Sequence, residues 1–357
     1  MRLMLHTAPG LDRILWREVR SLDPDATNEG ARLVGGRNSL LLVESDDPDA
    51  LLYSRLSEDL YALVAHTQEL ALSRKGLEQL AELIHRAPDW DAGLRLHAQF
   101  TGGRAGRRLS TYRVLARAQG ERGYQRSEAS RAIAAGLQAR LGKNWRLVED
   151  DAQVEVWVTL INTEALVGIR LTTRTQRHRA KDANIPASLR PAVAAALVYL
   201  TDPEDEDLFL DPFCGAGTIL LERAAAGRHR LLIGSDSSPQ ALTAARENIG
   251  PRHKPLELHG WDATHIPLGD ASVSAIATNP PFGEQLGSHE ENRRLYPRFL
   301  SEAHRLLTPG GRLVVITSET ELMQRELVQP AWTITSRFPV GVLGKRAQIY
   351  AARRNEG

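Results

Sequence analysis

Two patterns of hydrophobic and polar positions divide the 357-residue chain. In the first half, short alternating segments that predict strands are mixed, in no regular order, with segments whose apolar residues recur at helical spacing. From residue 191 onward, apolar strand-like segments alternate regularly with helical ones, which indicates a parallel, doubly wound sheet. The predicted strands of this second half are 207–213, 230–236, 256–260, 273–279, 311–318, 332–338 and 347–353. The last two have no helix-length insert between them, so we expect them to be antiparallel.

The first half predicts an α+β arrangement. The first strand is expected to end at Pro9-Gly10. Hairpins are predicted at 31–45 and 154–171, and further strands at 59–72, 94–100 and 111–118. Helices are predicted at 11–22, 76–87 and 127–141, and Ser127 is the expected cap of the last. These elements suggest four segments: a ferredoxin-like unit at 1–60, a second small α+β unit at 61–171, a basic linker at 172–190 and an α/β domain at 191–357.

Composition limits the class of protein. The hydrophobic content of 42% and the charged content of 25% are typical of soluble domains, and no apolar run approaches the roughly 18 residues that span a bilayer. The N-terminus has no signal-peptide pattern, so we expect a cytoplasmic protein. One cysteine excludes a disulfide framework or a multi-cysteine metal site, and the eleven histidines are scattered, so no metal is expected.

The net charge of +1 hides one strongly basic block. Residues 95–146 contain twelve Lys and Arg against only Glu121 and Glu128. Such a block is typical of a surface that binds a polyanion such as a nucleic acid, although a merely solvated face explains the charge equally well.

A glycine turn follows the first strand of the α/β half, in the segment DPFCGAGT. Gly215 and Gly217 allow a tight turn and a close approach of the backbone to a ligand. The turn lacks the third glycine of a dinucleotide site, and no Gly-Lys-Ser/Thr follows, so it does not predict a phosphate-binding loop. We expect Cys214, within the turn, to be a small buried apolar residue.

Two acidic residues follow the next two strands. Asp236, about twenty residues beyond the glycines, has the position of a carboxylate that binds ribose hydroxyls. A helix cap is the alternative, and both roles fit if Ser238 is the cap. Asp262 is placed to bind an adenine amino group, or it is simply a turn residue.

The segment Asn279-Pro280-Pro281-Phe282, at the end of the fourth strand, is the strongest chemical signal. Two prolines give up two backbone donors and stiffen the chain. The Asn279 side chain and the Pro280 carbonyl can together accept both hydrogens of an exocyclic base amine, which turns the nitrogen lone pair toward a methyl donor. Phe282 offers a platform for a flipped-out base. Methylation at a base carbon would instead need a thiolate, and no cysteine lies in or after this segment.

In this order and spacing, the segments DPFCGAGT, GSD, WDAT and NPPFGEQLG resemble the bacterial and archaeal RNA guanine-N2 methyltransferases that carry a THUMP domain. The segments TAPGLDRILWREV, YRVLARAQGERGYQRSEASRAI and HRAKDANIPASLRPAVAAAL of the first half and the connector are similar to them too. The resemblance covers essentially the whole chain and is greatest to the tRNA enzymes that form N2-methylguanosine in the acceptor stem.

The resemblance implies a class I (Rossmann-like) methyltransferase domain with a mostly parallel seven-stranded sheet, preceded by a ferredoxin-like unit and a THUMP RNA-binding domain at 61–171. It implies S-adenosyl-L-methionine as cofactor, tRNA held at its 3′ CCA end and acceptor region, and a monomer. The catalytic residues would be Asn279, Pro280 and Phe282. The cofactor-binding residues would be Asp211, Phe213, Gly215, Gly217, Thr218, Asp236, Ser237, Asp262, Ala263 and Asn279. The RNA-binding residues would be Arg104, Arg107, Arg108, Arg113, Arg126, Arg174 and Arg177.

Alternatives stay open at this point. Guanine-N2 methylation of 23S or other ribosomal RNA is the nearest. An adenine-N6 DNA methylase and a glutamine-N5 protein methylase use the same Asn-Pro-Pro arrangement to bind an amine, but neither function explains the basic first half. An RNA-binding protein with an inactive methylase domain is the alternative outside enzymes.

Overall fold

The computed structural model describes residues 1–36, 38–102, 110–173, 188–250, 253, 255–281, 288–342 and 344–356. The chain divides into two compact units, Met1–Arg177 and His178–Gly357, and each is described by itself. Among the described residues, no helix is long and apolar enough to cross a membrane.

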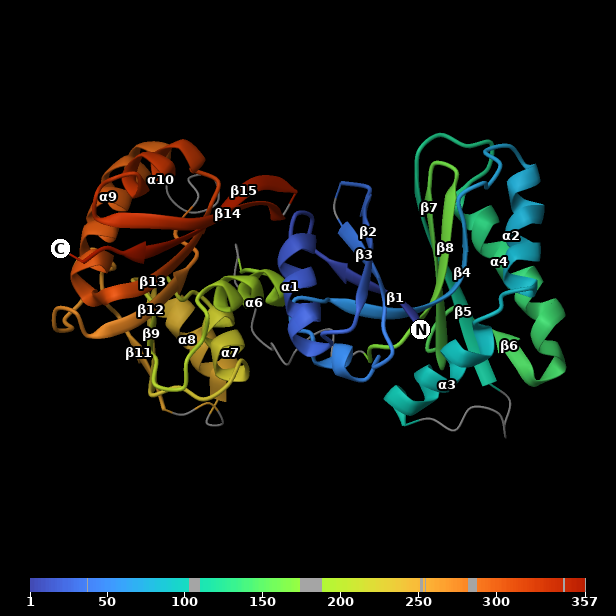
Figure 1. Ribbon diagram of the computed structural model, residues 1–357, viewed down its shortest axis with the longest axis horizontal. Coiled ribbons are helices and arrows are strands. Elements are labelled where there is room, and N and C mark those ends of the chain that lie inside the picture. Colours follow the sequence, from blue (N-terminus) through green and yellow to red (C-terminus); the bar gives the residue numbers. More distant parts are fainter. Residues whose placement is uncertain are drawn as a thin grey trace. The chain divides into compact units, whose positions relative to one another are not determined.

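The first unit contains one mixed sheet of eight strands in the order β2-β3-β1-β4-β8-β7-β5-β6 (Figure 1). Strand β5 pairs in parallel with β6 and β7, and the other pairs are antiparallel. The strands are β1 Arg2–Thr7, β2 Thr27–Val34, β3 Asn38–Glu44, β4 Asp59–Thr67, β5 Ser110–Gln119, β6 Trp145–Leu147, β7 Val154–Ile161 and β8 Glu164–Arg170. Both predicted hairpins are confirmed. Strand β4 begins at Asp59 and pairs with β1, so the sheet continues across position 60 and a division there stays a prediction.

The helices of this unit are α1 Asp12–Leu22, α2 Lys75–His85, α3 Trp90–Thr101 and α4 Arg126–Leu141, with short 3-10 turns at Ala50–Tyr53 and Gly142–Asn144. The predicted strand at 94–100 is wrong, because this segment lies within α3. Its buried residues Trp90, Gly93 and Leu96 recur every three positions, and a Cβ on Gly93 would lie 2.7 Å from Val64 Cγ1 of the sheet. A seven-residue alternation was too short to distinguish a strand from this amphipathic helix.

The cap of α4 also differs from the prediction. The N-cap is Gln125, which forms a reciprocal capping box with Glu128, and Ser127 lies inside the first turn. The glutamine side chain takes the part usually played by serine or threonine, so the common capping residues pointed to the wrong position.

The second unit contains a seven-stranded sheet in the order β11-β10-β9-β12-β13-β15-β14. The strands are β9 Leu208–Asp211, β10 Leu231–Ser235, β11 Leu256–His259, β12 Val273–Thr278, β13 Leu307–Thr317, β14 Trp332–Val342 and β15 Lys345–Arg354. The first five strands pair in parallel, whereas β15 is antiparallel to both β13 and β14. The Rossmann-like class and the antiparallel closing pair are therefore confirmed.

The helices of this unit are α6 Pro191–Leu200, α7 Thr218–Ala225, α8 Pro239–Ile249, α9 His289–Leu306 and α10 Thr320–Leu327 (Figure 1). A hydrophobic cluster joins α9 and α10 to the sheet through Tyr296, Phe299, Met323 and Trp332, among others. Helix α6 is buried along almost its whole length, because seven of its ten residues are buried small or aliphatic ones.

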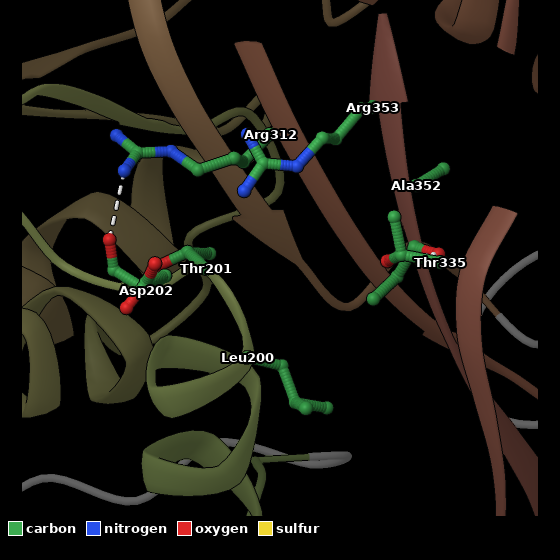
Figure 2. Close-up of a pocket in the computed structure, with 8 residues that line it drawn as sticks. Leu200, Thr201, Asp202, Arg312, Thr335, Ala352 and Arg353 are labelled. Atoms are coloured by element: carbon green, nitrogen blue, oxygen red, sulfur yellow. Dashed lines mark hydrogen bonds between the residues drawn. The ribbon is translucent and has the colours of Figure 1, made fainter. Parts of the chain in front are cut away.

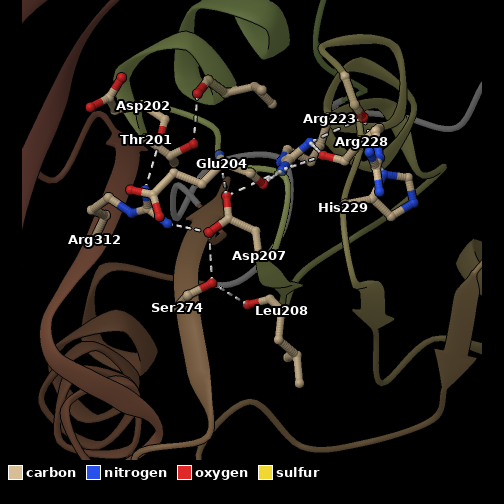
Figure 3. Close-up of polar contacts among 12 residues, drawn as sticks. Thr201, Asp202, Glu204, Asp207, Leu208, Arg223, Arg228, His229, Ser274 and Arg312 are labelled. Carbon is tan, nitrogen blue, oxygen red and sulfur yellow. Dashed lines mark hydrogen bonds and ion pairs between the residues drawn. The ribbon is translucent and has the colours of Figure 1, made fainter.

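The amino-terminal ends of the strands are held by a buried ionic network around Asp207 (Figure 3). The Asp207 carboxylate accepts from the guanidinium groups of Arg312 and Arg223, from the Ser274 hydroxyl at 2.7 Å and from the Glu204 amide at 2.9 Å. Asp207 is 1% exposed and Arg223 is fully buried. Burial opposes ionisation of Asp207, but these donors outweigh it and hold the pKa below its ordinary value. Both oxygens of the Asp207 carboxylate are therefore hydrogen-bonded, although Arg223 Nε has no partner among the described residues.

Candidate active site

The predicted site residues gather at the opposite, carboxyl edge of the second sheet. Strands β11, β10, β9 and β12 are neighbours and run in parallel, so their carboxyl ends meet at one edge. Asp262, Asp236, Asp211 and Asn279 lie at or just beyond these four ends. Four segments that are far apart in the sequence thus form one candidate site.

The glycine turn after β9 has the backbone conformation that the sequence predicts. Gly215 and Gly217 have φ of 51° and 78°, in the left-handed region that favours glycine. Gly217 is the N-cap of α7, and a Cβ on it would lie 2.9 Å from Ile249 Cδ1 of α8. Close packing as well as the turn therefore requires glycine at 217.

Asp236 connects this turn to the end of β10. One carboxylate oxygen accepts the Gly215 amide at 2.9 Å, and the other accepts the Ser238 amide at 2.9 Å. Ser238 caps α8, because its hydroxyl oxygen accepts the Ala241 amide at 3.3 Å. The helix cap is thus Ser238, which leaves Asp236 available for the predicted ribose-binding role. Each oxygen of Asp236 has a further lone pair with which to accept a ligand hydroxyl.

Asp211, the last residue of β9, is fully buried. Its Oδ1 accepts the Thr278 hydroxyl at 2.7 Å and the Phe213 amide at 3.3 Å, whereas Oδ2 has no hydrogen-bond partner among the described residues. Burial raises the pKa of Asp211 to about 7, against the opposing effect of these two hydrogen bonds. A cationic group beside Oδ2 would satisfy the orphaned oxygen and favour the ionised form.

Asn279 follows β12 and is half-buried. Its side-chain oxygen Oδ1 is buried and has no hydrogen-bond partner within the described part of the chain. A buried acceptor without a donor costs about 1–3 kcal/mol, and a ligand that brings an N–H donor would remove this cost. This acceptor is where the sequence predicts a base amine.

Other predicted residues take supporting positions. The Phe213 ring packs edge-on against Phe299, with centroids 5.2 Å apart, and Ala263 lies in the same core cluster. Hydrogen bonds from the Thr264 amide and hydroxyl hold the pKa of Asp262 below its ordinary value. Ser237 is exposed, and Thr218 is the buried first residue of α7. Cys214, in the glycine turn, is buried as predicted, and burial raises the pKa of its thiol.

Several predicted residues lie outside the described ranges: Phe282, Arg104, Arg107, Arg108, Arg174 and Arg177. Of the remaining predicted RNA-binding residues, Arg126 is exposed at the start of α4. Arg113 forms ion pairs with Glu155 at 2.5 Å and Asp150 at 3.3 Å, so its charge is partly balanced within the first unit.

The edge residues fit S-adenosylmethionine. Its ribose hydroxyls would meet Asp236, and its ammonium group would meet the orphaned oxygen of Asp211, two complementary pairings for a molecule that carries no phosphate.

A cavity of about 130 Å³ lies elsewhere, between the end of α6 and strands β13, β14 and β15 (Figure 2). No predicted site residue lines it, and it is smaller than the 300–1,000 Å³ typical of small-molecule sites. Among the described residues, no cluster of three or more His, Cys, Asp or Glu could hold a metal ion.

Three residues that support the site were not predicted. Thr278 links β12 to Asp211, and Tyr296 of α9 donates to the Pro281 carbonyl at 2.9 Å while contacting the Thr317 hydroxyl at 2.8 Å. Thr278 directly precedes Asn279 at the end of β12, so its position in the sequence could have indicated a role in the site. Tyr296 sits in the apolar pattern of a helix, where a core aromatic is the ordinary interpretation.

Comparisons with known proteins show which family the chain is similar to. The family described as RMKL-like, methyltransferase domain matches residues 177–348. A tRNA (guanine(6)-N2)-methyltransferase of Thermus thermophilus is 31% identical over 92% of this chain and 92% of that protein. The human tRNA (guanine(6)-N(2))-methyltransferase THUMP3 is 30% identical over 68% of this chain and 51% of that protein, so the chain spans about half the length of this relative.

Solved structures extend the agreement to both units. The crystal structure of TrmN from Thermus thermophilus has a TM-score of 0.79 and 27% identity, and the match covers 99% of each chain. A methyltransferase structure complexed with SAH has a TM-score of 0.71 over 100% of this chain and 98% of that one; at 14% identity it supports the fold alone. By its sequence relatives and its fold, the chain belongs to the tRNA (guanine-N2)-methyltransferase family.

Proposed function

We propose that this protein is an S-adenosylmethionine-dependent enzyme that methylates the exocyclic N2 of a guanine in tRNA. The observation that carries the proposal is the buried Oδ1 of Asn279, which has no hydrogen-bond partner among the described residues, at the edge where Asp211, Asp236 and the glycine turn meet. An acceptor in this state suits an amine that brings its own N–H donor. The names of the Thermus thermophilus and human relatives support guanine N2 in tRNA as that amine.

The residues of the edge would act mainly by position. Asn279 Oδ1 would accept one N–H of the amine, and the Pro280 carbonyl would accept the other, so that the nitrogen lone pair faces the methyl group. When bound, S-adenosylmethionine supplies a methyl group on a sulfonium whose sulfide is a good leaving group. As the N–C bond forms the amine gains positive charge, which the two acceptor oxygens stabilise, and the surplus proton then passes to water. Phe282 would support the face of the guanine.

The first unit would hold the RNA. Its basic block at 95–146 and the exposed Arg126 on α4 support this role, and the family resemblance suggests a THUMP domain that binds the 3′ CCA end. With the CCA end held there, a guanine of the acceptor stem is the proposed target. We also propose that the protein acts as a monomer in the cytoplasm.

The test is methyl transfer to defined RNA. Wild-type protein is incubated with labelled S-adenosylmethionine and, in separate reactions, unmodified tRNA transcripts or ribosomal RNA. The product nucleoside is identified by digestion and mass spectrometry. N2-methylguanosine that maps to the acceptor stem supports the proposal. Label in ribosomal RNA but not in tRNA, or a different methylated nucleoside, would contradict it. Asn279→Ala is the control for adventitious methylation.

A further inference from the structure

The Asn279-Pro280-Pro281 segment is positioned by hydrogen bonds that neighbouring residues make at its two ends. Because neither proline has an amide hydrogen, the segment cannot be anchored by donating from these two positions, and a neighbour must donate to its carbonyls. At its start, the Thr278 hydroxyl donates to Asp211 at 2.7 Å. At its end, the Pro281 carbonyl accepts the Tyr296 hydroxyl at 2.9 Å. Asn279 lies between these two anchors.

The second anchor, the Tyr296 hydroxyl, is buried and stays protonated, so it remains a hydrogen-bond donor. Tyr296 and Thr317 are both fully buried, one on α9 and the other at the carboxyl end of β13, and their hydroxyls lie 2.8 Å apart. Burial raises the pKa of Tyr296 well above its usual range, so the phenol stays protonated and cannot act as a base at neutral pH. The Thr317 oxygen also accepts the Glu319 amide at 2.9 Å, which fixes its position. The hydrogen-bonded chain therefore ties the segment to the sheet.

We infer that Tyr296, held by Thr317, is a positioning residue for methyl transfer: its hydroxyl fixes the Pro281 carbonyl and thereby the direction in which Asn279 Oδ1 and the Pro280 carbonyl meet the amine. This inference rests on the proposed function. It goes beyond the function because it assigns a role in the reaction to a buried aromatic residue that ordinary pattern reading assigns to the core.

The test is Tyr296→Phe, which removes only the hydroxyl. A misplacement on the order of 1 Å at a reacting group can lower the rate about a hundredfold, so we expect kcat to fall about 10- to 100-fold. The Kd for S-adenosylmethionine and the KM for tRNA should stay within about twofold, because neither ligand is bound chiefly through this hydroxyl. Thr317→Val should lower kcat in the same way, and Thr317→Ser, which keeps a hydroxyl, should restore most of it.

Tyr350→Phe is the matched control. Tyr350 is also buried in the second unit, and its hydroxyl donates to the Thr320 carbonyl at 2.8 Å, at the start of α10 and not in the Asn-Pro-Pro segment. Both tyrosine variants lose one buried hydrogen bond and should show similar decreases in Tm. Only Tyr296→Phe should lose kcat.

Two results separate the inference from the proposed function. If wild-type protein forms N2-methylguanosine and Tyr296→Phe retains the wild-type kcat, or loses no more than Tyr350→Phe, the positioning role is overturned while the function stands. If wild-type protein methylates no guanine N2 in any RNA, the proposed function fails first, and the inference, which rests on it, fails with it.

Discussion

Replacing Asn279 tests the chemistry most directly. Its Oδ1 is buried and bonded to none of the described residues, so none of them has to release it before it accepts a base N–H. The new bond strengthens as the amine gains positive charge in the transition state. Deleting one preorganised polar group of this kind costs about 2.7–4 kcal/mol, which corresponds to a loss of about 10²–10³ in kcat for Asn279→Ala.

The same structural observation predicts an unusual separation of activity from stability. Most substitutions of half-buried residues destabilise a protein, but removing an unsatisfied buried acceptor also removes a cost of about 1–3 kcal/mol. We therefore expect Asn279→Ala to unfold in urea with a free energy equal to or above that of wild type. Affinity for tRNA should hardly change if, as proposed, the first unit provides most of it.

Single-turnover methylation with saturating tRNA and S-adenosylmethionine measures the relevant rate. Asn279→Asp keeps an acceptor oxygen and adds negative charge, so it should retain substantial activity. An Asp variant as inactive as the Ala variant would mean that the amide hydrogens of Asn279 matter, by donation to the base or the cofactor. Full activity in Asn279→Ala would refute the proposed mechanism.

Three further predictions concern the carboxylates of the second unit. Asp236→Ala should weaken S-adenosylmethionine binding about a hundredfold by calorimetry, because two charge-assisted bonds worth about 1.5–3 kcal/mol each are lost along with the bond that holds the Gly215 amide; unchanged affinity would reduce Asp236 to a structural residue. Wild-type affinity for this cationic donor should rise as the pH rises through about 7, where Asp211 ionises, and Asp211→Asn should remove that dependence. Asp207→Asn should lower the free energy of unfolding by about 3–5 kcal/mol, because two guanidinium groups lose their buried carboxylate. Since the pKa of Asp207 is lowered, its contribution should be present above the pKa of the unfolded chain and disappear as the pH falls through the folded value; a flat profile in wild type would contradict this.

The second half of the fold was predictable because its central strands β9, β10, β12 and β13 are buried along most of their length and are bounded by turn residues. Long apolar segments such as 273–279 and 311–318 leave little doubt about their type, and the short final connection requires antiparallel pairing. Once the strands are known to be parallel and adjacent, the gathering of Asp211, Asp236, Asp262 and Asn279 follows from topology alone. The candidate site was therefore largely visible in the sequence.

The first half was less predictable because its signals are short and local. Seven alternating residues at 94–100 matched a strand, whereas the helix α3 is decided by contacts with β4 and β8 that the sequence cannot reveal. The buried hydroxyl chain from Pro281 through Tyr296 to Thr317 was invisible for the same reason. Hydrogen bonds between residues 15 and 21 positions apart depend on how α9 packs against β13.

The two edges of the second sheet differ in how the side-chain oxygens of Asp207, Asp211 and Asn279 are hydrogen-bonded. At the amino edge, Asp207 accepts from two guanidinium groups, a hydroxyl and an amide, and both of its oxygens are bonded. At the carboxyl edge, Asp211 and Asn279 each keep a buried oxygen without a donor among the described residues. Folding alone would favour filling those acceptors, because each unsatisfied oxygen costs about 1–3 kcal/mol. Buried polar atoms without a partner among the described residues also occur elsewhere, and Arg223 Nε at the amino edge is one of them. Under the proposed function, however, the two acceptors at the carboxyl edge would each gain a donor from a ligand, a cation at Asp211 and a base amine at Asn279.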